Sequence, residues 1–305
     1  MAESPDLSII ILNYNVRDLL LNCLESIFKN KKSSDNWQII VVDNASSDGS
    51  VGAVREFREK HPEMELVENK ENLGFSAGNN VGVKEAKAPV ILFLNPDTVV
   101  VGGAITESLK YLMINPDIGA LTCRVELPDG SLDYSCHRGF PTPWNAFAYF
   151  SGLSKIFPRS PFFAGYTATY LDINETHEID CLTGAFLMVR KIAGDQIGWW
   201  DTDYFWNGED IEFCFSLKEK GWKIYFYPEA KIIHYKGSSS GLWKSAATDV
   251  ERKDRLLAIS HGTSAMRIFY KKHYYKKYPP ILRDFILIAI KTLEHYRKAK
   301  LWIFP

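Results

Sequence analysis

The stretch Val90–Val100, "VILFLNPDTVV", runs five apolar residues directly into Asn95, Pro96 and Asp97 before apolar residues resume. A short continuous apolar run is typical of a strand buried on both faces, as in a parallel sheet. The carboxylate that follows either caps the next turn or belongs to a site at the edge of the sheet. The stretch therefore predicts a central strand, and it makes Asp97 a candidate functional residue.

Similar apolar runs recur through the first 116 residues and alternate with segments of helical periodicity. This alternation is typical of βαβ units and predicts a parallel sheet flanked by helices. Ligands of such sheets bind beyond the carboxyl ends of the strands, so we expect Asn13, Asp43 and Asp97 at one edge. The predicted strands are Leu7–Asn13, Trp37–Asp43, Met64–Asn69 and Pro89–Asn95, and the predicted helices are Val16–Lys29, Ser46–His61, Ser76–Lys87 and Gly102–Pro116.

The regular alternation ends near Pro116. The segment Ser131–Glu178 is rich in aromatic residues, Pro and Gly, and we interpret it as a long mobile segment over a site. Strands are then expected at Asp180–Lys191 and Trp222–Pro228, with a helix between them at Asp210–Lys220. From about Thr248 onward the chain is expected to be helical.

Composition favours a folded chain with a basic tail. The 305 residues are 46% hydrophobic with a net charge of −1, which suits one large domain or two modest ones. From Gly241 onward fourteen Lys/Arg face five Asp/Glu, which leaves 22 against 32 in residues 1–240. This asymmetry indicates an anionic surface or partner for the tail.

The sequence carries no expected signal peptide or membrane-spanning helix. The start "MAESPDLSIIILNYN" lacks a basic n-region, and charges interrupt the apolar segment Ile281–Pro305. Five widely spaced cysteines without a CxxC pair indicate reduced thiols and a cytoplasmic protein.

Two polar stretches follow predicted strands in the N-terminal half. In "VVDNASSDGS" (Val41–Ser50), the carboxylate of Asp43 can accept hydrogen bonds from a ribose hydroxyl or a base N–H, although ordinary helix capping is an alternative. The absence of GxGxxG disfavours a nicotinamide or flavin site. In "ENLGFSAGNN" (Glu71–Asn80), Gly74 permits close backbone approach, and Asn72 and Asn79 offer neutral donors and acceptors.

Two further stretches carry acid, base and cationic groups. "WNGEDIEFCFSLKEKGW" (Trp206–Trp222) places Glu209 and Asp210 where they either favour the helix dipole or accept a proton from a hydroxyl. Neighbouring aromatic residues suit the apolar face of a sugar. In "IIHYKGSSSG" (Ile232–Gly241), His234 can join Asp97 on Mg²⁺ or Mn²⁺, and Lys236 can neutralise phosphate.

In this order the stretches resemble the inverting, nucleotide-sugar-dependent glycosyltransferases of family 2, and among them the rhamnosyltransferase-like enzymes. The resemblance covers Leu7 to Gly241. It is carried by "IIILNYN", "VVDNASSDGS", "ENLGFSAGNN", "LFLNPDTVV", "LTGAFLMVRK", "YFWNGEDIEFCF" and "HYKGSSS". It implies an α/β fold, the GT-A nucleotide-diphospho-sugar transferase fold, with a Rossmann-like, mostly parallel central sheet flanked by helices and a helical basic C-terminal extension.

The resemblance also implies a division of the chain. Residues 1–240 would form the GT-A catalytic domain, with a nucleotide-sugar-binding half at 1–116 and an acceptor-binding half at 117–240. Residues 241–305 would form the helical extension, which contacts a membrane or another subunit.

Site roles follow from the same resemblance. Asp210 matches the general base, and Glu209 supports it or contacts the acceptor together with Trp206. Asp97 and His234 would hold a divalent cation, Mg²⁺ or Mn²⁺, although Asn95 stands where the family's DXD motif has its first acid. The nucleotide-sugar contacts would come from Asn13, Asn15, Asp43, Asn72, Gly74, Asn79, Asn95, Asp97 and Lys236.

The implied reaction transfers a sugar, with L-rhamnose from dTDP-rhamnose as a candidate, to a hydroxyl of a glycan or lipid-linked oligosaccharide in cell-surface polysaccharide synthesis. A nucleotidyltransferase and a catalytically silent carbohydrate-binding module remain as alternatives, but "LNYNVRDLL" lacks the glycines that a nucleotidyltransferase loop would carry. The basic aromatic tail suits peripheral contact with the cytoplasmic face of an anionic membrane, or packing on the catalytic domain or a second copy. Nucleic acid is not an expected partner.

Overall fold

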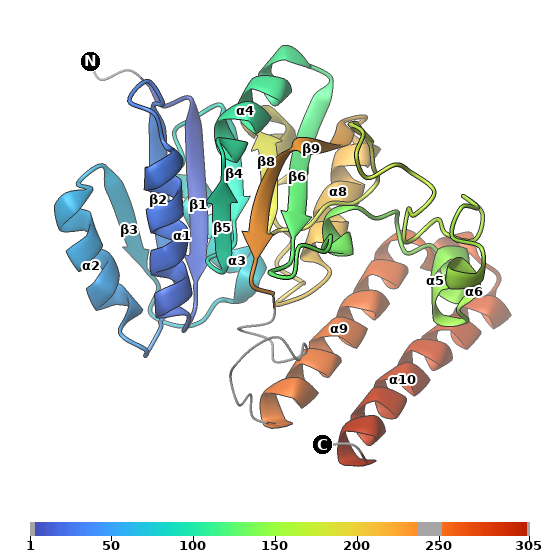
Figure 1. Ribbon diagram of the computed structural model, residues 1–305. Coiled ribbons are helices and arrows are strands. Elements are labelled where there is room, and N and C mark those ends of the chain that lie inside the picture. The colour runs from blue at the N-terminus through green and yellow to red at the C-terminus, as the bar shows by residue number, and fades with distance from the viewer. Residues whose placement is uncertain (1–3, 237–251, 304–305) are drawn as a thin grey trace.

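The computed structural model describes residues 4–236 and 252–303, and it shows one central sheet with helices on its faces (Figure 1). The strand order is β3-β2-β1-β4-β8-β6-β9-β5, and β7 also pairs with β9. The strands are β1 (Leu7–Asn13), β2 (Trp37–Asp43), β3 (Met64–Glu68), β4 (Val90–Leu94), β5 (Thr98–Val101), β6 (Ile118–Glu126), β7 (His177–Glu178), β8 (Phe186–Arg190) and β9 (Lys223–His234). The helices are α1 (Arg17–Asn30), α2 (Ser50–Lys60), α3 (Gly74–Glu85), α4 (Ala104–Ile114), α5 (Pro143–Phe150), α6 (Leu153–Ile156), α7 (Lys191–Ile197), α8 (Glu209–Glu219), α9 (Arg252–His273) and α10 (Pro280–Ile303), with short 3-10 turns η1 (Tyr134–Cys136) and η2 (Tyr275–Lys277).

The N-terminal half confirms the predicted parallel arrangement. Strand β1 pairs in parallel with β2 and β4, and β2 pairs in parallel with β3. Every residue of β4 is buried, because the sheet has helices on both faces there. The register places Asn13 opposite Asp43, so both side chains end at the same edge of the sheet.

The C-terminal half of the sheet is mixed. Strand β8 runs antiparallel to both β4 and β6, and β9 runs parallel to β6 but antiparallel to β5. The short strand β5, formed by the apolar residues after Asp97, was not predicted separately from β4. Its pairing with β9 sets Thr98 opposite His234, and the backbone N–H of Tyr235 donates to the carbonyl of Asp97 at 2.8 Å.

The segment after Pro116 is more regular than the sequence predicts. Strand β6 is nine residues long and largely buried, yet Gly119, Ala120, Thr122 and Cys123 give it no continuous run of large apolar residues. The part interpreted as one long loop contains η1, α5, α6 and β7. Conversely, the strand predicted at Asp180–Lys191 shortens to β8, since the residues before Phe186 form only isolated pairings.

The tail forms a pair of helices, α9 and α10, that stands beside the sheet (Figure 1). Helix α9 packs through Phe269 and Tyr270 near Phe215 of α8 and Phe140, while Ile290 of α10 joins the same cluster. No helix within residues 4–236 and 252–303 is long and apolar enough to cross a membrane. The domain division stays a prediction, because its boundary at residues 240/241 falls outside the described residues, as do the small residues of "HYKGSSS" after Lys236.

Candidate active site

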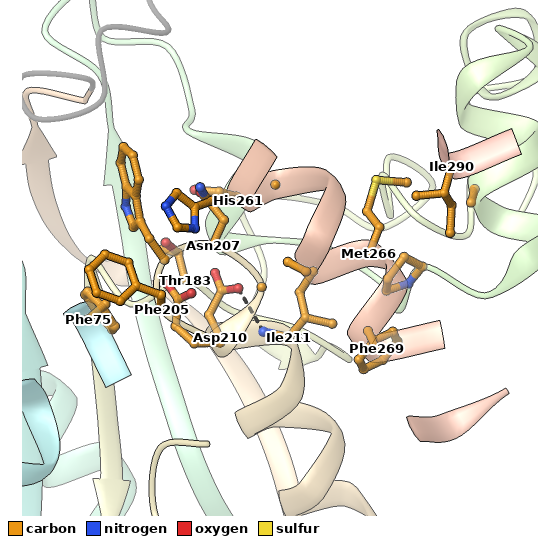
Figure 2. Close-up of a pocket in the computed structure, with 18 of the residues that line it drawn as sticks. Phe75, Thr183, Phe205, Asn207, Asp210, Ile211, His261, Met266, Phe269 and Ile290 are labelled. Carbon is orange, nitrogen blue, oxygen red and sulfur yellow. Dashed lines mark hydrogen bonds between the residues drawn. The ribbon is translucent and has the colours of Figure 1, made fainter. Parts of the chain in front are cut away.

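A cavity of about 2010 Å³ opens at the carboxyl ends of the central strands and extends to the C-terminal helices. Figure 2 shows part of its wall, with Phe75 and Phe205 on one side, Asp210 near the centre and Met266 on the other side. The predicted site residues that line it are Asn15, Asn72, Gly74, Asn95, Asp97, Trp206, Glu209, Asp210, His234 and Lys236. Residues separated by more than 200 positions in the chain therefore meet in one cavity.

Three predicted residues do not line this cavity: Asn13, Asp43 and Asn79. The amide of Asn13 donates to Asp43 at 2.8 Å, and the other oxygen of Asp43 accepts from the backbone N–H of Ser46 at 2.8 Å. Asn79 donates to the Phe75 carbonyl within α3 at 3.0 Å. Asn13 and Asp43 thus hold the loop after β2, and Asn79 bonds within its own helix. Direct contact with a nucleotide stays a prediction for all three.

Asn72 and Gly74 build a tight loop at the cavity wall. The side-chain oxygen of Asn72 accepts from the backbone N–H of Gly74 and from the amide of Asn44, both at 2.9 Å. Gly74 has a φ of 78°, and a Cβ there would lie 2.6 Å from the Phe205 carbonyl. Position 74 therefore requires glycine, because the backbone there lies too close to Phe205 for a side chain.

Asp97 and His234 meet as predicted, because β5 pairs with β9. The Nε2 atom of His234 lies 3.2 Å from Asp97, and its Nδ1 atom lies 3.2 Å from Asp133. Burial opposes protonation of His234, but the two carboxylates outweigh burial and raise its pKa to about 9. Lys236 binds the other oxygen of Asp133 at 2.7 Å.

Asp133 is a buried carboxylate that sequence reasoning missed. Although burial disfavours its charged form, His234 and Lys236 lower its pKa well below the usual range. It thereby stays ionised, orients the imidazole, and holds Lys236 at the cavity wall. Its position in an irregular loop gave no pattern from which this role could be read.

The acids Glu209 and Asp210 begin α8 at the wall of the cavity. Asn207 and Gly208 precede them with φ values of 70° and 89°, a left-handed turn that delivers both acids to the start of the helix. A Cβ on Gly208 would lie 2.8 Å from Ala265, so the turn also lets α9 approach closely. The helical tail therefore forms part of the site's wall.

Asp210 is held by Arg138. The guanidinium donates to Asp210 Oδ2 at 2.6 Å and to the carbonyl oxygens of Ser135 and Leu182 at 2.8 and 3.0 Å. Burial alone would lower the pKa of Arg138, but the negative charge of Asp210, with smaller contributions from other neighbours, outweighs burial and holds this pKa above its ordinary value. Asp210 Oδ1 accepts from the backbone N–H of Ile211 at 2.8 Å. Arg138 lies in the aromatic segment that we interpreted only as a cover, so its partner was not predicted.

Glu209 differs from its neighbour in charge. Burial and the adjacent charge of Asp210 raise the pKa of Glu209 to about 8, and its Oε2 atom is buried without a hydrogen-bond partner in the described part of the chain. Its surroundings therefore favour the neutral form of Glu209, while Asp210 has Arg138 as its counterion. This asymmetry makes Asp210 the acid equipped to accept a proton.

Comparisons with known proteins find similarity to enzymes that transfer or polymerise sugars. Residues 8–172 match the model of the family described as glycosyl transferase family 2. An N-acetylglucosaminyl-diphospho-decaprenol L-rhamnosyltransferase of Mycobacterium tuberculosis is 28% identical over 214 residues, which cover 67% of this chain and 68% of the relative. A poly-beta-1,6-N-acetyl-D-glucosamine synthase of Staphylococcus epidermidis is 25% identical over 239 residues, 78% of this chain but only 52% of the relative.

Two solved structures share the fold at low sequence identity. The mannosyltransferase PcManGT from Pyrobaculum calidifontis, in complex with GDP-Man and Mn²⁺, is 16% identical with a TM-score of 0.60 and covers 99% of this chain and 74% of its own. GalNAc-T7 with UDP, GalNAc and Mn²⁺ is 14% identical with a TM-score of 0.58, over 77% of this chain and 44% of its own. The GT-A architecture is thus common to all three chains.

Proposed function

Because the chain belongs to glycosyl transferase family 2 and is a glycosyltransferase with the GT-A fold, we propose that it moves L-rhamnose from dTDP-rhamnose, with inversion, to a hydroxyl of a lipid-linked glycan. The observation that carries the proposal is one cavity that holds a paired Asp97 and His234 as well as Asp210. The Mycobacterium tuberculosis relative, whose name includes both L-rhamnose and a diphospho-decaprenol acceptor, supports the transferred sugar and the lipid-linked acceptor.

Asp210 accepts the proton of the acceptor hydroxyl in this mechanism. The hydroxyl oxygen attacks the anomeric carbon on the face opposite the nucleoside diphosphate, the bond from that carbon to the diphosphate oxygen breaks, and the configuration inverts. Arg138 holds Asp210 in place through a 2.6 Å contact, and Trp206 offers an aromatic face for the acceptor sugar. Lys236 contributes positive charge where the diphosphate departs.

Asp97 and His234 fit a divalent cation at the diphosphate. The cation would replace the proton that His234 Nε2 shares with Asp97, while Asp133, 3.2 Å from Nδ1, would keep the proton on that atom, as in many metal sites. An oxygen and an imidazole suit Mg²⁺ or Mn²⁺, and such an ion would stabilise the charge of the leaving diphosphate. The described residues hold no cluster of three His, Cys, Asp or Glu ligands, so the donor's phosphates and water would complete the shell.

The tail supports a peripheral contact with the cytoplasmic face of an anionic membrane. Ile281, Phe285 and Ile288 of α10 are 87%, 67% and 63% exposed. Large apolar side chains at this exposure, on a helix rich in Lys and Arg, suit the interface between lipid headgroups and acyl chains.

A thermal-shift panel of dTDP, UDP and GDP with Mg²⁺ or Mn²⁺ tests the proposed donor. We expect dTDP with the cation to stabilise the protein most, because a ligand that binds only the folded state raises its stability. Transfer of labelled rhamnose from dTDP-rhamnose to a lipid-linked N-acetylglucosamine acceptor would then complete the test. Equal and negligible shifts with all three nucleotides would contradict the proposal.

A further inference from the structure

The cavity is larger than donor and acceptor sugars require. Small-molecule pockets usually occupy about 300–1,000 Å³, whereas this cavity measures about 2010 Å³. The polar residues of the proposed reaction gather at its strand end, around Asp97 and Asp210. The remaining space extends between α5, α9 and α10, away from the sheet.

This remaining space is a groove with apolar walls. Its lining includes Trp144, Phe147 and Phe150 on α5, and Phe285, Ala289 and Leu293 on α10. These side chains offer a surface for hydrocarbon and few hydrogen-bonding groups for a sugar. We call this part of the cavity, bounded by the six residues just named, the helix groove.

The helix groove is continuous with the site of proton transfer. Ile211, directly after Asp210, packs against both the main core and the cluster around Phe269 and Ile290. In Figure 2 Asp210 and Ile211 lie next to each other, with Met266, Phe269 and Ile290 beyond them. All five residues line the same cavity, so a molecule whose hydroxyl meets Asp210 can extend into the groove.

The outer edge of the groove is open and carries a cation, Arg297. Phe147 and Phe285 are 56% and 67% exposed, and the guanidinium of Arg297 lies 5.8 Å from the ring centre of Phe150. Thirteen Lys/Arg against three Asp/Glu occur in residues 252–303. An apolar groove with Arg297 at its border, on helices that are basic as a whole, complements a hydrocarbon chain attached to a phosphate.

We propose that the helix groove binds the hydrocarbon chain of a lipid-linked acceptor and thereby places the acceptor sugar at Asp210. The assignment deepens the proposed function and rests on it for the identity of the sugar. The hydrocarbon chain would bind in the groove and not on the exposed outer face of α10, because the groove is continuous with the cavity that holds Asp210. A bilayer contact and a second copy of the protein are the competing occupants.

Binding of farnesyl phosphate, measured by isothermal titration calorimetry below its critical micelle concentration and without vesicles, tests the groove. Methyl phosphate serves as the ligand without a chain. The variant Ala289→Trp fills the groove, and Ala299→Trp is the matched control, because both alanines are exposed on α10 but only Ala289 lines the cavity. Melting curves verify folding, and sedimentation velocity reports the oligomeric state.

We expect farnesyl phosphate to bind at least tenfold more tightly than methyl phosphate, Ala289→Trp to weaken it at least tenfold, and Ala299→Trp to leave it unchanged. Equal affinity for the two phosphates, or equal weakening by both variants, would overturn the groove. The groove proposal would also be overturned if the wild type is a dimer, if Ala289→Trp dissociates this dimer, and if farnesyl phosphate does not. A second copy of the protein would then be the occupant of the groove. Titration of dTDP with Mg²⁺ in the same variants separates this test from the proposed function: normal dTDP binding without farnesyl phosphate binding rejects the groove alone.

Discussion

Arg138 and Asp210, 72 residues apart in the chain, form a partly buried ion pair with 2.6 Å between Nη2 and Oδ2. The pair joins the aromatic segment over the cavity to the first turn of α8. Because Arg138 is itself fixed by the carbonyls of Ser135 and Leu182, it sets the position of the carboxylate. We therefore expect different effects when Asp210, the proton acceptor, and Arg138, which positions it, are substituted.

Asp210→Asn removes the proton acceptor while keeping nearly the same shape. We expect kcat for sugar transfer to fall by about 10²–10⁴, while the Kd of dTDP with Mg²⁺ changes less than about threefold. Calorimetry and a transfer assay measure the two quantities. An equal loss of dTDP affinity would instead assign Asp210 to donor binding.

Arg138→Lys keeps the charge but loses the planar set of donors that contacts Asp210 and the two carbonyls. We expect kcat to fall by about 10–100-fold, since small misplacement of a catalytic group is costly, with KM for the donor little changed. Arg124→Lys is the matched control, because Arg124 also forms an ion pair, with Glu126 at 3.0 Å, but does not line the cavity. If both variants lost the same activity, Arg138 would have only a structural role.

Glu209→Gln should change how stability depends on pH. The pKa of Glu209 is raised to about 8 by burial and Asp210, so the folded protein binds its proton more tightly than the unfolded chain does. The stability that this proton contributes is fully present below the unfolded pKa and is lost as pH rises toward 8.

Urea unfolding at pH 5.5 and 7.5 measures this effect. Relative to Glu209→Gln, the wild type should lose stability over this range by at most about 1.4 kcal/mol per pH unit. Glu219→Gln, on the exposed side of the same helix, should track the wild type at both pH values. A wild-type-like pH slope in Glu209→Gln would show that Glu209 titrates normally.

The exposed apolar side chains of α10 predict binding to anionic membranes. The variant Ile281→Asp should reduce cosedimentation with phosphatidylglycerol vesicles at least about tenfold, because a large side chain that does not line the helix groove leaves the interface. Ile114→Asp on α4, where Ile114 is 75% exposed, is the control and should bind as the wild type does. Unchanged vesicle binding by Ile281→Asp would remove this face of α10 from the membrane contact.

The sequence predicted the N-terminal half of the fold in detail. Leu7–Asn13 and Trp37–Asp43 occur as strands with the expected bounds, because continuous apolar runs end at turn residues there. It also predicted that Asp97 and His234 meet, since both follow buried strands whose ends share one edge.

The contacts made by Asp133 and Arg138 could not be predicted from the periodicity of the sequence. Both residues lie in irregular chain, and their partners are more than 70 positions away. Local periodicity fixes which side of a strand a residue occupies, but it carries no information on where a loop folds back. The placement of Asp43 behind the cavity wall likewise depends on its bond to Ser46, which competes with a ligand for the same carboxylate.

The central claim is that a cation-bound nucleoside diphosphate lies at Asp97 and His234, with Asp210 across the cavity as the proton acceptor. A crystal structure with dTDP and Mn²⁺, with data collected at the manganese absorption edge, tests it most directly. We predict one anomalous peak within about 2.5 Å of both Asp97 and His234 Nε2, with the diphosphate beside it and Asp210 free of phosphate. A manganese peak elsewhere, or a diphosphate bound against Asp210, would contradict the account.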